Sequence, residues 1–246
     1  MLSVVIITLN EQTTIANILN DLKQQTVNDF EVIVVDSCSD DDTIEVAQKF
    51  SDDFKYFKII KNETRGVSLG RNTGAAAAKF ERLLFLDADT RLNSDFIKQA
   101  LDIVDTQKID IAGVYCDMSQ GTPANRSTLA LVNVGLWFTK WVFPTIVGAC
   151  ILSTKTAHSA VGGFNEKIQI GEDCEYAVKA KSDKKLKFNM IYLTFKFDMR
   201  RFEQEGHIKI LYIWSIANIR RFFIGEITKD EVSYEFGHHA KKHKNL

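Results

Sequence analysis

Short, unbroken runs of large apolar residues alternate with amphipathic segments along the first hundred residues. An unbroken apolar run is typical of a parallel strand covered on both faces, whereas apolar residues three and four apart indicate a helix. This pattern predicts strands at 4–9, 30–35, 57–61 and 83–86, and helices at 10–25, 43–50, 67–79 and 95–104. Such alternation predicts βαβ units and a mainly parallel α/β sheet with helices on both faces.

The pattern is less regular after residue 104. Residues 109–116 are predicted as a strand, and the polar segment 117–128, which contains Gly121 and Pro123, as a loop. Residues 129–143 carry Trp137 and Trp141, which we expect to pack in the core at helical spacing; a wall facing an acceptor or a membrane is the alternative. Further elements are predicted as a helix opening at 171 and running to 181, a strand-like stretch after 187 and an apolar helix at 208–223.

Polar residues follow three of the predicted strands. Right-handed crossovers place the ends of parallel strands at one edge of the sheet, and open α/β sheets bind their ligands there. We therefore expect residues 8–11, 36–41 and 87–89 to converge on one site.

Two carboxylates, Asp87 and Asp89, directly follow the most apolar strand, 83–86. In an extended backbone, side chains two residues apart point the same way. Hard oxygen ligands at a strand end suit Mg²⁺ or Mn²⁺ bound together with substrate phosphates. The alternative is a loop in which Asp87 caps the next helix.

Composition narrows the class of protein. A chain of 246 residues with 45% hydrophobic and 26% charged residues is typical of one large soluble globular domain, and a formal charge of −1 gives no reason to expect nucleic-acid binding. The four cysteines are scattered, which argues against a zinc site and fits a reducing cytosol. The first residues indicate a strand and not a signal peptide, and Lys140 and Pro144 interrupt the apolar segment 129–152, so we expect no spanning helix.

Five motifs in order carry a resemblance to a known family. They are Asp-Ser-Cys-Ser-Asp-Asp-Asp-Thr at 36–43, Gly-Val-Ser-Leu-Gly-Arg-Asn-Thr-Gly at 66–74, Leu-Asp-Ala-Asp at 86–89, Gly-Gly-Phe-Asn-Glu at 162–166 and Gly-Glu-Asp at 171–173. Together they resemble glycosyltransferase family 2 over roughly residues 1–205. The resemblance implies a GT-A (Rossmann-like) fold: a single domain 1–227 with a nucleotide-sugar-binding half, 1–95, and an acceptor-binding half, 96–227. The basic tail 228–246 is expected to be a solvated terminus, with membrane or polyanion contact as the alternative.

The resemblance also implies roles for particular residues in an inverting, metal-dependent sugar transfer from a UDP- or GDP-linked donor. Asp36 would bind the base or ribose, Arg71 would lie near the nucleotide, and Asp87 would lie near the ribose. Asp89 would bind Mg²⁺ or Mn²⁺ at the diphosphate, and Asp87 is the second candidate metal ligand. The remaining donor-binding candidates at the strand ends are Thr8, Asn10, Glu11, Ser37 and Ala88.

The proton acceptor is expected to be Asp173 or its neighbour Glu172, with Asp173 preferred because it takes the second place of the family's Glu-Asp pair. Acidic residues in a first helical turn also have a simple explanation in the helix dipole. Arg200 and Arg201 suit a diphosphate, because guanidinium groups match phosphate oxygens, and a surface salt bridge is an equal alternative. A lone histidine, His207, is a weak candidate for a third metal ligand.

Departures from the family pattern limit what the resemblance implies. Ser37 and Cys38 replace a usual Asp and Gly, which weakens any inference about the base. The Gln-X-X-Arg-Trp pattern of processive synthases is missing, so transfer of one sugar per encounter is expected. The expected acceptor is a glycan or a lipid-linked hydroxyl in cell-surface glycan or glycolipid synthesis. The expected location is the cytoplasm, with a peripheral position at the inner face of the cell membrane as an option. The sugar, the base and the oligomeric state stay open.

Other classes of protein remain as alternatives. A nucleotidyltransferase on a related fold would normally carry a Gly-rich phosphate loop early in the chain, and no glycine follows Leu9 there. An NAD-dependent oxidoreductase would need the Gly-X-Gly-X-X-Gly turn, which is also missing. A nucleotide-sugar-binding protein without transferase activity would be expected to have lost some of the aspartates named above.

Overall fold

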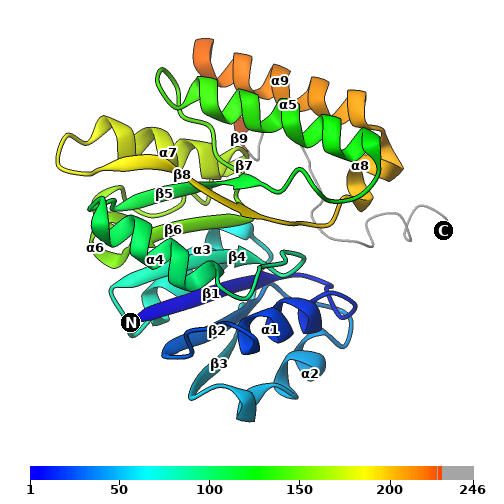
Figure 1. Cartoon of the computed structure of the whole chain (residues 1–246), viewed down its shortest axis with the longest axis vertical. Coiled ribbons are helices and arrows are strands. Elements are labelled where there is room, and N and C mark those ends of the chain that lie inside the picture. Colours follow the sequence, from blue (N-terminus) through cyan, green and yellow to red (C-terminus); the bar gives the residue numbers. More distant parts are fainter. Residues whose placement is uncertain (226, 229–246) are drawn as a thin grey trace.

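The computed structural model describes residues 1–225 and 227–228, without the side chains of Arg201, Ile227 and Thr228. A seven-stranded sheet runs through the molecule in the order β3-β2-β1-β4-β6-β5-β8 (Figure 1). The strands are β1 (Leu2–Thr8), β2 (Phe30–Asp36), β3 (Tyr56–Lys61), β4 (Arg82–Asp87), β5 (Ile111–Cys116), β6 (Cys150–Thr154) and β8 (Phe188–Phe195). All neighbouring pairs are parallel except those of β6, which is antiparallel to both β4 and β5. The predicted mixed, mainly parallel sheet is confirmed.

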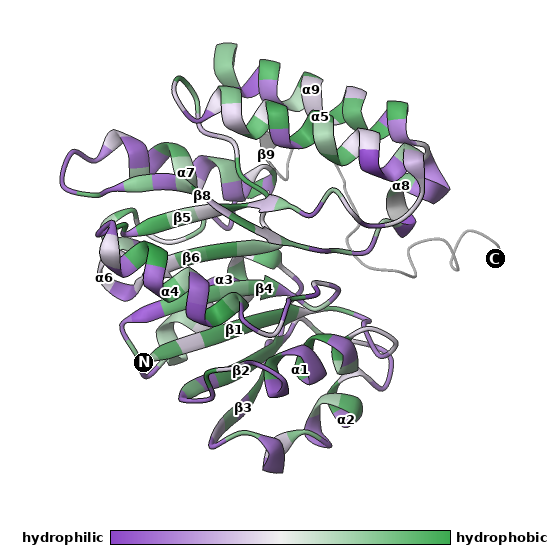
Figure 2. Cartoon of the chain, viewed as in Figure 1, coloured by the Kyte–Doolittle hydropathy of each residue, from purple (hydrophilic) through white to green (hydrophobic). Residues whose placement is uncertain are grey.

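The apolar runs form central strands because both faces of these strands are covered. Every residue of β1 and β2 is buried, and Figure 2 shows the central strands as hydrophobic. Successive side chains of a strand point to opposite faces. Val4 and Ile6 therefore belong to one core cluster, and Val5 between them belongs to the other.

Helices complete a layer on each face of the sheet. The layer packed against Val4 and Ile6 contains α1 (Ile15–Lys23), α2 (Thr43–Gln48) and α4 (Phe96–Thr106). The layer packed against Val5 contains α3 (Val67–Ala77), α6 (Lys155–Ala160) and α7 (Glu172–Ser182). A short 3₁₀ helix, Ser51–Asp53, precedes β3.

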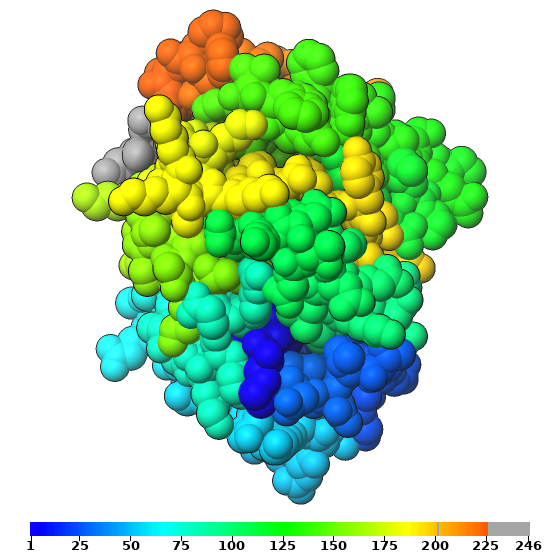
Figure 3. Space-filling view, turned by 60° about the vertical axis from the view of Figure 1, so that its left-hand side comes forward, coloured from blue at the N-terminus to red at the C-terminus, as the bar shows by residue number. Residues whose placement is uncertain are grey.

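Three further helices lie beyond β8, at the end of the sheet opposite β3 (Figure 1). They are α5 (Pro123–Thr139), α8 (Arg200–Glu205) and α9 (His207–Phe223), and α5 lies beside α9. A separate small sheet pairs β7 (Ile168–Ile170) with β9 (Ile227–Thr228). The colours of Figure 3 therefore change from blue at one end of the molecule to green and orange at the other. No helix within the described ranges is both long and apolar enough to cross a bilayer.

The structure corrects several predictions for the second half of the chain. The predicted loop 117–128 is wrong from Pro123 onward, because Pro123 opens α5 and Thr122 caps the helix by accepting a hydrogen bond from the Asn125 amide at 3.2 Å. The expectation that Trp137 and Trp141 lie in the core is also wrong, since they are 49% and 67% exposed. Strand β6 was not predicted, and it joins residues beyond 96 to β4 in one continuous sheet. The division at residue 95 stays a prediction, and the tail from residue 229 lies outside the described residues.

A close approach between α3 and the sheet depends on Gly74. A Cβ atom built at Gly74 would lie 2.1 Å from Val5 Cγ1 and 3.2 Å from Val35 Cγ2, so even a methyl group forces the helix away from β1 and β2. Gly135 in α5, by contrast, has nothing within 4 Å of the position that an added methyl group would occupy.

We expect Gly74→Ala to lower the free energy of unfolding by about 1–3 kcal/mol through overpacking, measured by urea denaturation. Gly135→Ala is the matched control and should be neutral or stabilising by up to about 1 kcal/mol, because alanine favours a helix. Equal effects of the two substitutions would contradict the close packing of α3.

Candidate active site

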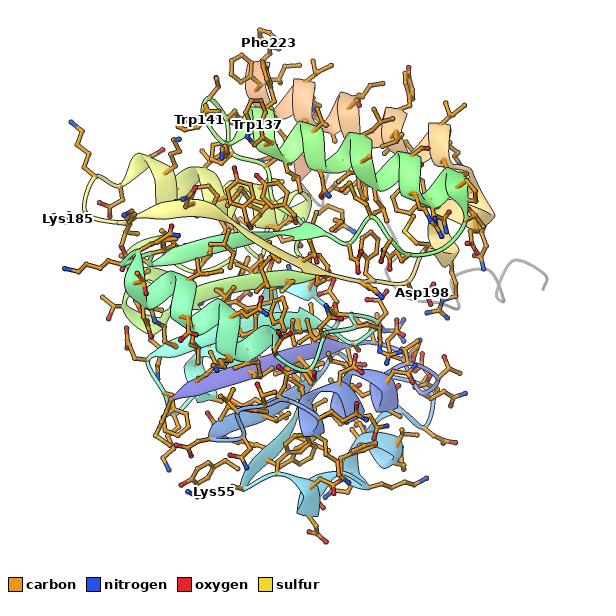
Figure 4. The ribbon with its side chains drawn as sticks, viewed as in Figure 1. Lys55, Trp137, Trp141, Lys185, Asp198 and Phe223 are labelled. Atoms are coloured by element: carbon orange, nitrogen blue, oxygen red, sulfur yellow. The ribbon has the colours of Figure 1, made fainter. Side chains whose placement is uncertain are left out.

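The ends of β1, β2 and β4 meet at a large cleft, as predicted. The register pairs Thr8 with Asp36 and Ile7 with Asp87, so the three strands end at the same edge. The cleft has a volume of about 1700 Å³ and is bounded on its other sides by α5, α7 and α9. Asp198, which also lines the cleft, is labelled in Figure 4 on the side toward which β1 runs. The predicted site residues that line the cleft are Thr8, Asn10, Glu11, Ser37, Arg71, Asp87, Ala88, Asp89, Glu172 and Asp173.

The loops after β1 and β2 are joined by hydrogen bonds. The Asn10 amide donates to Ser39 Oγ at 2.9 Å, and the Asp40 amide donates to Asn10 Oδ1 at 2.7 Å. The Glu11 amide donates to Thr43 Oγ1 at 2.8 Å. Asn10 has φ 56°, a left-handed conformation that asparagine tolerates better than most residues. These contacts hold one wall of the cleft in place.

Asp36 lies behind this wall and not in it. Its side chain is fully buried and is absent from the cleft lining. One carboxylate oxygen accepts from the Ser39 amide at 3.0 Å, and the other accepts from Ser39 Oγ. Direct contact between Asp36 and a base or ribose is therefore not supported by this geometry. In front of it, Thr8 Oγ1 is buried, lines the cleft and has no hydrogen-bond partner among the described residues.

Arg71 is the centre of an ion-pair network that lines the cleft. Its side chain is 2% exposed. Nη1 donates to Glu172 Oε1 at 2.8 Å, while Nη2 donates to Asp87 Oδ1 and to the Gly148 carbonyl, both at 3.1 Å. The Arg71 guanidinium also lies 5.1 Å from the Phe164 ring centroid. This one side chain connects α3, the end of β4 and the start of α7.

Burial raises the pKa values of two carboxyl groups that line the cleft, Asp87 and Asp173. Burial raises the pKa of Asp87 and outweighs the opposing effect of Arg71. Burial also raises the pKa of Asp173 to about 6, with a further contribution from the negative charge of Glu172. Glu172 is the carboxylate that pairs with Arg71, whereas Asp173 accepts from the neighbouring Cys174 amide at 2.7 Å and lines the cleft. The structure therefore gives the two adjacent acids different surroundings.

The donor atoms at the end of β4 fit a divalent cation that shares its coordination with a ligand. Within residues 1–225 and 227–228, no group of three or more histidine, cysteine, aspartate and glutamate side chains could enclose a metal ion. Mg²⁺ is usually held by one or two carboxylates together with substrate phosphates, so an open site of this kind is sufficient. Asp89, which is partly exposed in the cleft, and Asp87, which is engaged by Arg71, are the two predicted ligands at this strand end.

The predicted diphosphate helpers are less well placed. Arg200 pairs with Asp198 through Nε and lies 3.8 Å from Glu11 Oε2 through Nη2, at the edge of the cleft and outside its lining. The side chain of Arg201 lies outside the described part of the structure. His207 is hydrogen-bonded to Asn125 Oδ1 at 2.7 Å and does not line the cleft, so this geometry does not support it as a third metal ligand.

Sequence reasoning missed two residues of the cleft. Gly148 lies so close to the network that a Cβ atom there would be 2.8 Å from Arg71 Nη2 and 3.0 Å from Asp173 Oδ2. Arg221, from α9, is 4% exposed, lines the cleft, and its positive charge opposes the rise in the pKa of Asp173. The available signal for Arg221 was an arginine pair inside an otherwise apolar helix.

Comparison with known proteins identifies the class. Residues 3–157 match the family model described as "Glycosyl transferase family 2". The chain belongs to this family, which confirms the resemblance drawn from its motifs. It is 33% identical over 184 residues to poly(ribitol-phosphate) beta-N-acetylglucosaminyltransferase TarS of Staphylococcus aureus, covering 72% of this chain and 32% of that protein. It is 27% identical over 114 residues to cholesterol galactosyltransferase of Borreliella burgdorferi, covering 46% of this chain and 31% of that protein.

Solved structures show the same GT-A fold. TarS residues 1–349 of S. aureus superimpose with a TM-score of 0.63 and 20% identity, covering 86% of this chain and 64% of that one. Mannosyltransferase PcManGT of Pyrobaculum calidifontis, in complex with GDP-Man and Mn²⁺, gives a TM-score of 0.65 and 18% identity, covering 87% of this chain and 64% of that one. The chain spans about a third of the length of the two curated relatives named above.

We expect Arg71→Ala to destabilise the protein by about 3 kcal/mol, because it leaves the buried carboxylate of Glu172 and the partly buried one of Asp87 without their cation. Denaturant unfolding at neutral pH measures this loss. Arg65→Ala is the matched control, since Arg65 pairs with Asp40 where the two side chains are 51% and 77% exposed, and it should cost less than about 1 kcal/mol. A similarly small loss for Arg71→Ala would mean that the network does not support the fold.

Proposed function

We propose that this protein is an inverting, metal-dependent glycosyltransferase that moves one sugar from a UDP- or GDP-linked donor to a hydroxyl acceptor. The observation that carries the proposal is the pair of adjacent acids at the start of α7. Arg71 neutralises Glu172, while Asp173 lines the cleft with a raised pKa of about 6. A carboxylate whose pKa lies near the working pH is suited to accept a proton in catalysis.

In the proposed reaction, Asp173 accepts the proton of the acceptor hydroxyl. The hydroxyl oxygen forms a bond to the anomeric carbon from the face opposite the diphosphate, and the bond from that carbon to the diphosphate oxygen breaks. The electron pair leaves with the nucleoside diphosphate, and the configuration of the sugar is inverted. Glu172 is not the base in this scheme, because its carboxylate is already paired with Arg71.

The ends of β1, β2 and β4 are proposed to hold the donor. Asp89 would hold a divalent cation together with the diphosphate, and a bound Mg²⁺ or Mn²⁺ supplies stabilisation of the charge that develops on the leaving group. The unpartnered hydroxyl of Thr8 and the residues Asn10 and Ser37 line the part of the cleft assigned to the nucleoside. Asp36 would act indirectly, by holding Ser39 and the loop in front of it.

The relatives support this assignment without defining the substrates. TarS has been solved in complex with UDP and with UDP-GlcNAc, and PcManGT with GDP-Man and Mn²⁺, so both bases occur on this fold. The names of the curated relatives include a poly(ribitol-phosphate) and a cholesterol acceptor. We propose that the acceptor here is likewise a glycan or a lipid-linked hydroxyl, used in cell-surface glycan or glycolipid synthesis at the cytoplasmic side of a membrane.

We expect Asp89→Ala to abolish transfer and to remove the Mn²⁺-dependent rise in melting temperature caused by UDP or GDP, because the cation loses its main ligand. Thermal shift and release of free nucleoside diphosphate are measured with and without Mn²⁺. Asp102→Ala, an exposed change on α4, is the control and should match the wild type. Full activity of Asp89→Ala would reject the metal assignment. Binding without any release by the wild type, across a panel of nucleotide sugars and hydroxyl acceptors, would favour a nucleotide-sugar-binding protein.

We expect Asp173→Asn to lower kcat by about 10²–10⁴-fold while donor affinity is retained, because the base acts in the chemical step. Wild-type kcat should fall as the pH drops below about 6, where Asp173 becomes protonated. Collapse of donor binding in Asp173→Asn would move the base elsewhere.

The same substitution should not cost stability. Because folding raises the pKa of Asp173, the carboxyl group favours the folded state least above pH 6, where it is charged. Asp173→Asn should therefore melt at or above the wild-type temperature at pH 7.5, and the difference should shrink toward pH 4. Glu172→Gln is the contrasting control and should lower the melting temperature, since it weakens the pair with Arg71.

A further inference from the structure

The outer surface of α9 carries an apolar stripe that faces solvent. Ile208, Tyr212, Ile216, Ile219 and Phe223 recur at helical spacing and are between 45% and 84% exposed. A surface helix normally presents polar residues outward and apolar residues to the core. In α9 the inward positions, such as Ile210 and Ala217, are apolar as well. The outward stripe is therefore not required by the core of this chain.

The neighbouring helix has the same character. In α5 and the turn after it, Leu131, Val134, Phe138 and Trp141 are all more than 60% exposed. Figure 4 shows Trp137, Trp141 and Phe223 at the same end of the two-helix layer, away from β1 and β3. Exposed apolar side chains gathered on neighbouring helices mark sites of interaction with a protein or a membrane.

The charges around the stripes favour one kind of partner. Residues 123–143 and 207–224 contain no aspartate or glutamate, although the whole chain carries slightly more acidic than basic residues. The same two segments contain Arg126, Lys140, Lys209, Arg220 and Arg221, of which only Arg221 is buried. A second copy of this face would place like charges opposite one another, whereas anionic lipid headgroups would neutralise them. Aromatic residues next to basic ones are typical of helices that lie in a membrane interface.

We propose that the outer face of α5 and α9 docks on an anionic lipid surface, with the apolar stripes inserted at the level of the headgroups. Leu131 and Ile219 belong to the stripes and also line the cleft, so docking would hold the mouth of the cleft against the lipid. A lipid-attached acceptor would then reach Asp173 without leaving the membrane; this last step, but not the docking itself, rests on the proposed function.

The test is co-sedimentation of the full chain with vesicles in the absence of substrates. Binding to mixed phosphatidylcholine and phosphatidylglycerol vesicles at low salt is expected, with much weaker binding to phosphatidylcholine alone and partial loss at high salt. Tryptophan fluorescence should shift to shorter wavelength on binding, because Trp137 and Trp141 enter a less polar environment.

Two pairs of variants separate the apolar and the charged contributions. The double variant that carries Phe138→Ser and Phe223→Ser should bind vesicles about tenfold or more weakly. The double variant that carries Phe138→Leu and Phe223→Leu should retain most of the vesicle binding. Arg126→Glu with Lys140→Glu should abolish the preference for anionic vesicles. Lys55→Glu, at the opposite end of the molecule in Figure 4, is the matched control and should have no effect. None of these residues lines the cleft, so melting temperature and nucleotide-sugar binding should be unchanged.

Several outcomes would overturn the proposal. One is that the protein does not bind anionic vesicles at low salt. Another is that the serine variants bind vesicles as well as the wild type. A third is that the protein forms a dimer that does not bind vesicles and that the serine variants dissociate. The last result would identify a second copy as the partner of this face. Vesicle binding by a protein that transfers no sugar would support the docking while rejecting the proposed function, so the two failures are distinguishable.

Discussion

The pairing of Arg71 with Glu172 and Asp87 is the interaction on which the site depends. These three residues come from α3, α7 and the end of β4, and Arg71 and Glu172 are 101 residues apart in the chain. Arg71 donates three hydrogen bonds, to two carboxylates and a carbonyl, while its buried Nε has no hydrogen-bond partner among the described residues. The two opposite charges offset much of the cost of removing the cation from water. Without it, the start of α7 would lose this ion pair, which ties it to the end of β4.

The same network separates the chemistry of two neighbouring acids. Arg71 holds Glu172 in an ion pair, while the burial of the site and the charge of Glu172 raise the pKa of Asp173. A raised pKa in one carboxyl group of a site is a recurring basis for giving that group a role of its own. The Asp173 carboxylate is poorly solvated when it is charged at neutral pH, and this lowers the stability of the folded protein. Removing its charge is therefore expected to raise stability and to lower activity.

Helices α5 and α9 contribute one face to the core and the cleft and the other face to the outer surface of the molecule. Their inner faces complete the core and line the cleft through residues such as Leu136 and Arg221, and their outer faces are apolar without being covered by the described part of the chain. The proposed donor side of the cleft is built instead on β1, β2 and β4, whose ends carry the polar loops. Substrates of different polarity would therefore approach from different directions, with the donor held at the strand ends and the acceptor beside the two helices.

The amino-acid sequence alone was enough to place the strands of the first half and their common edge, because a parallel strand covered on both faces requires a continuous apolar run. Residues 4–9, 30–35 and 83–86 were placed to within a few residues for that reason. It could not determine β6, because the short apolar run from Cys150 to Leu152 is equally compatible with a buried helix segment. It also could not determine that Ser39 covers Asp36, that Arg71 selects Glu172 over Asp173, or that Trp137 and Trp141 face outward. The spacing of apolar residues predicts that one face of a helix is apolar. Only the tertiary contacts decide what covers that face and which carboxylate pairs with Arg71.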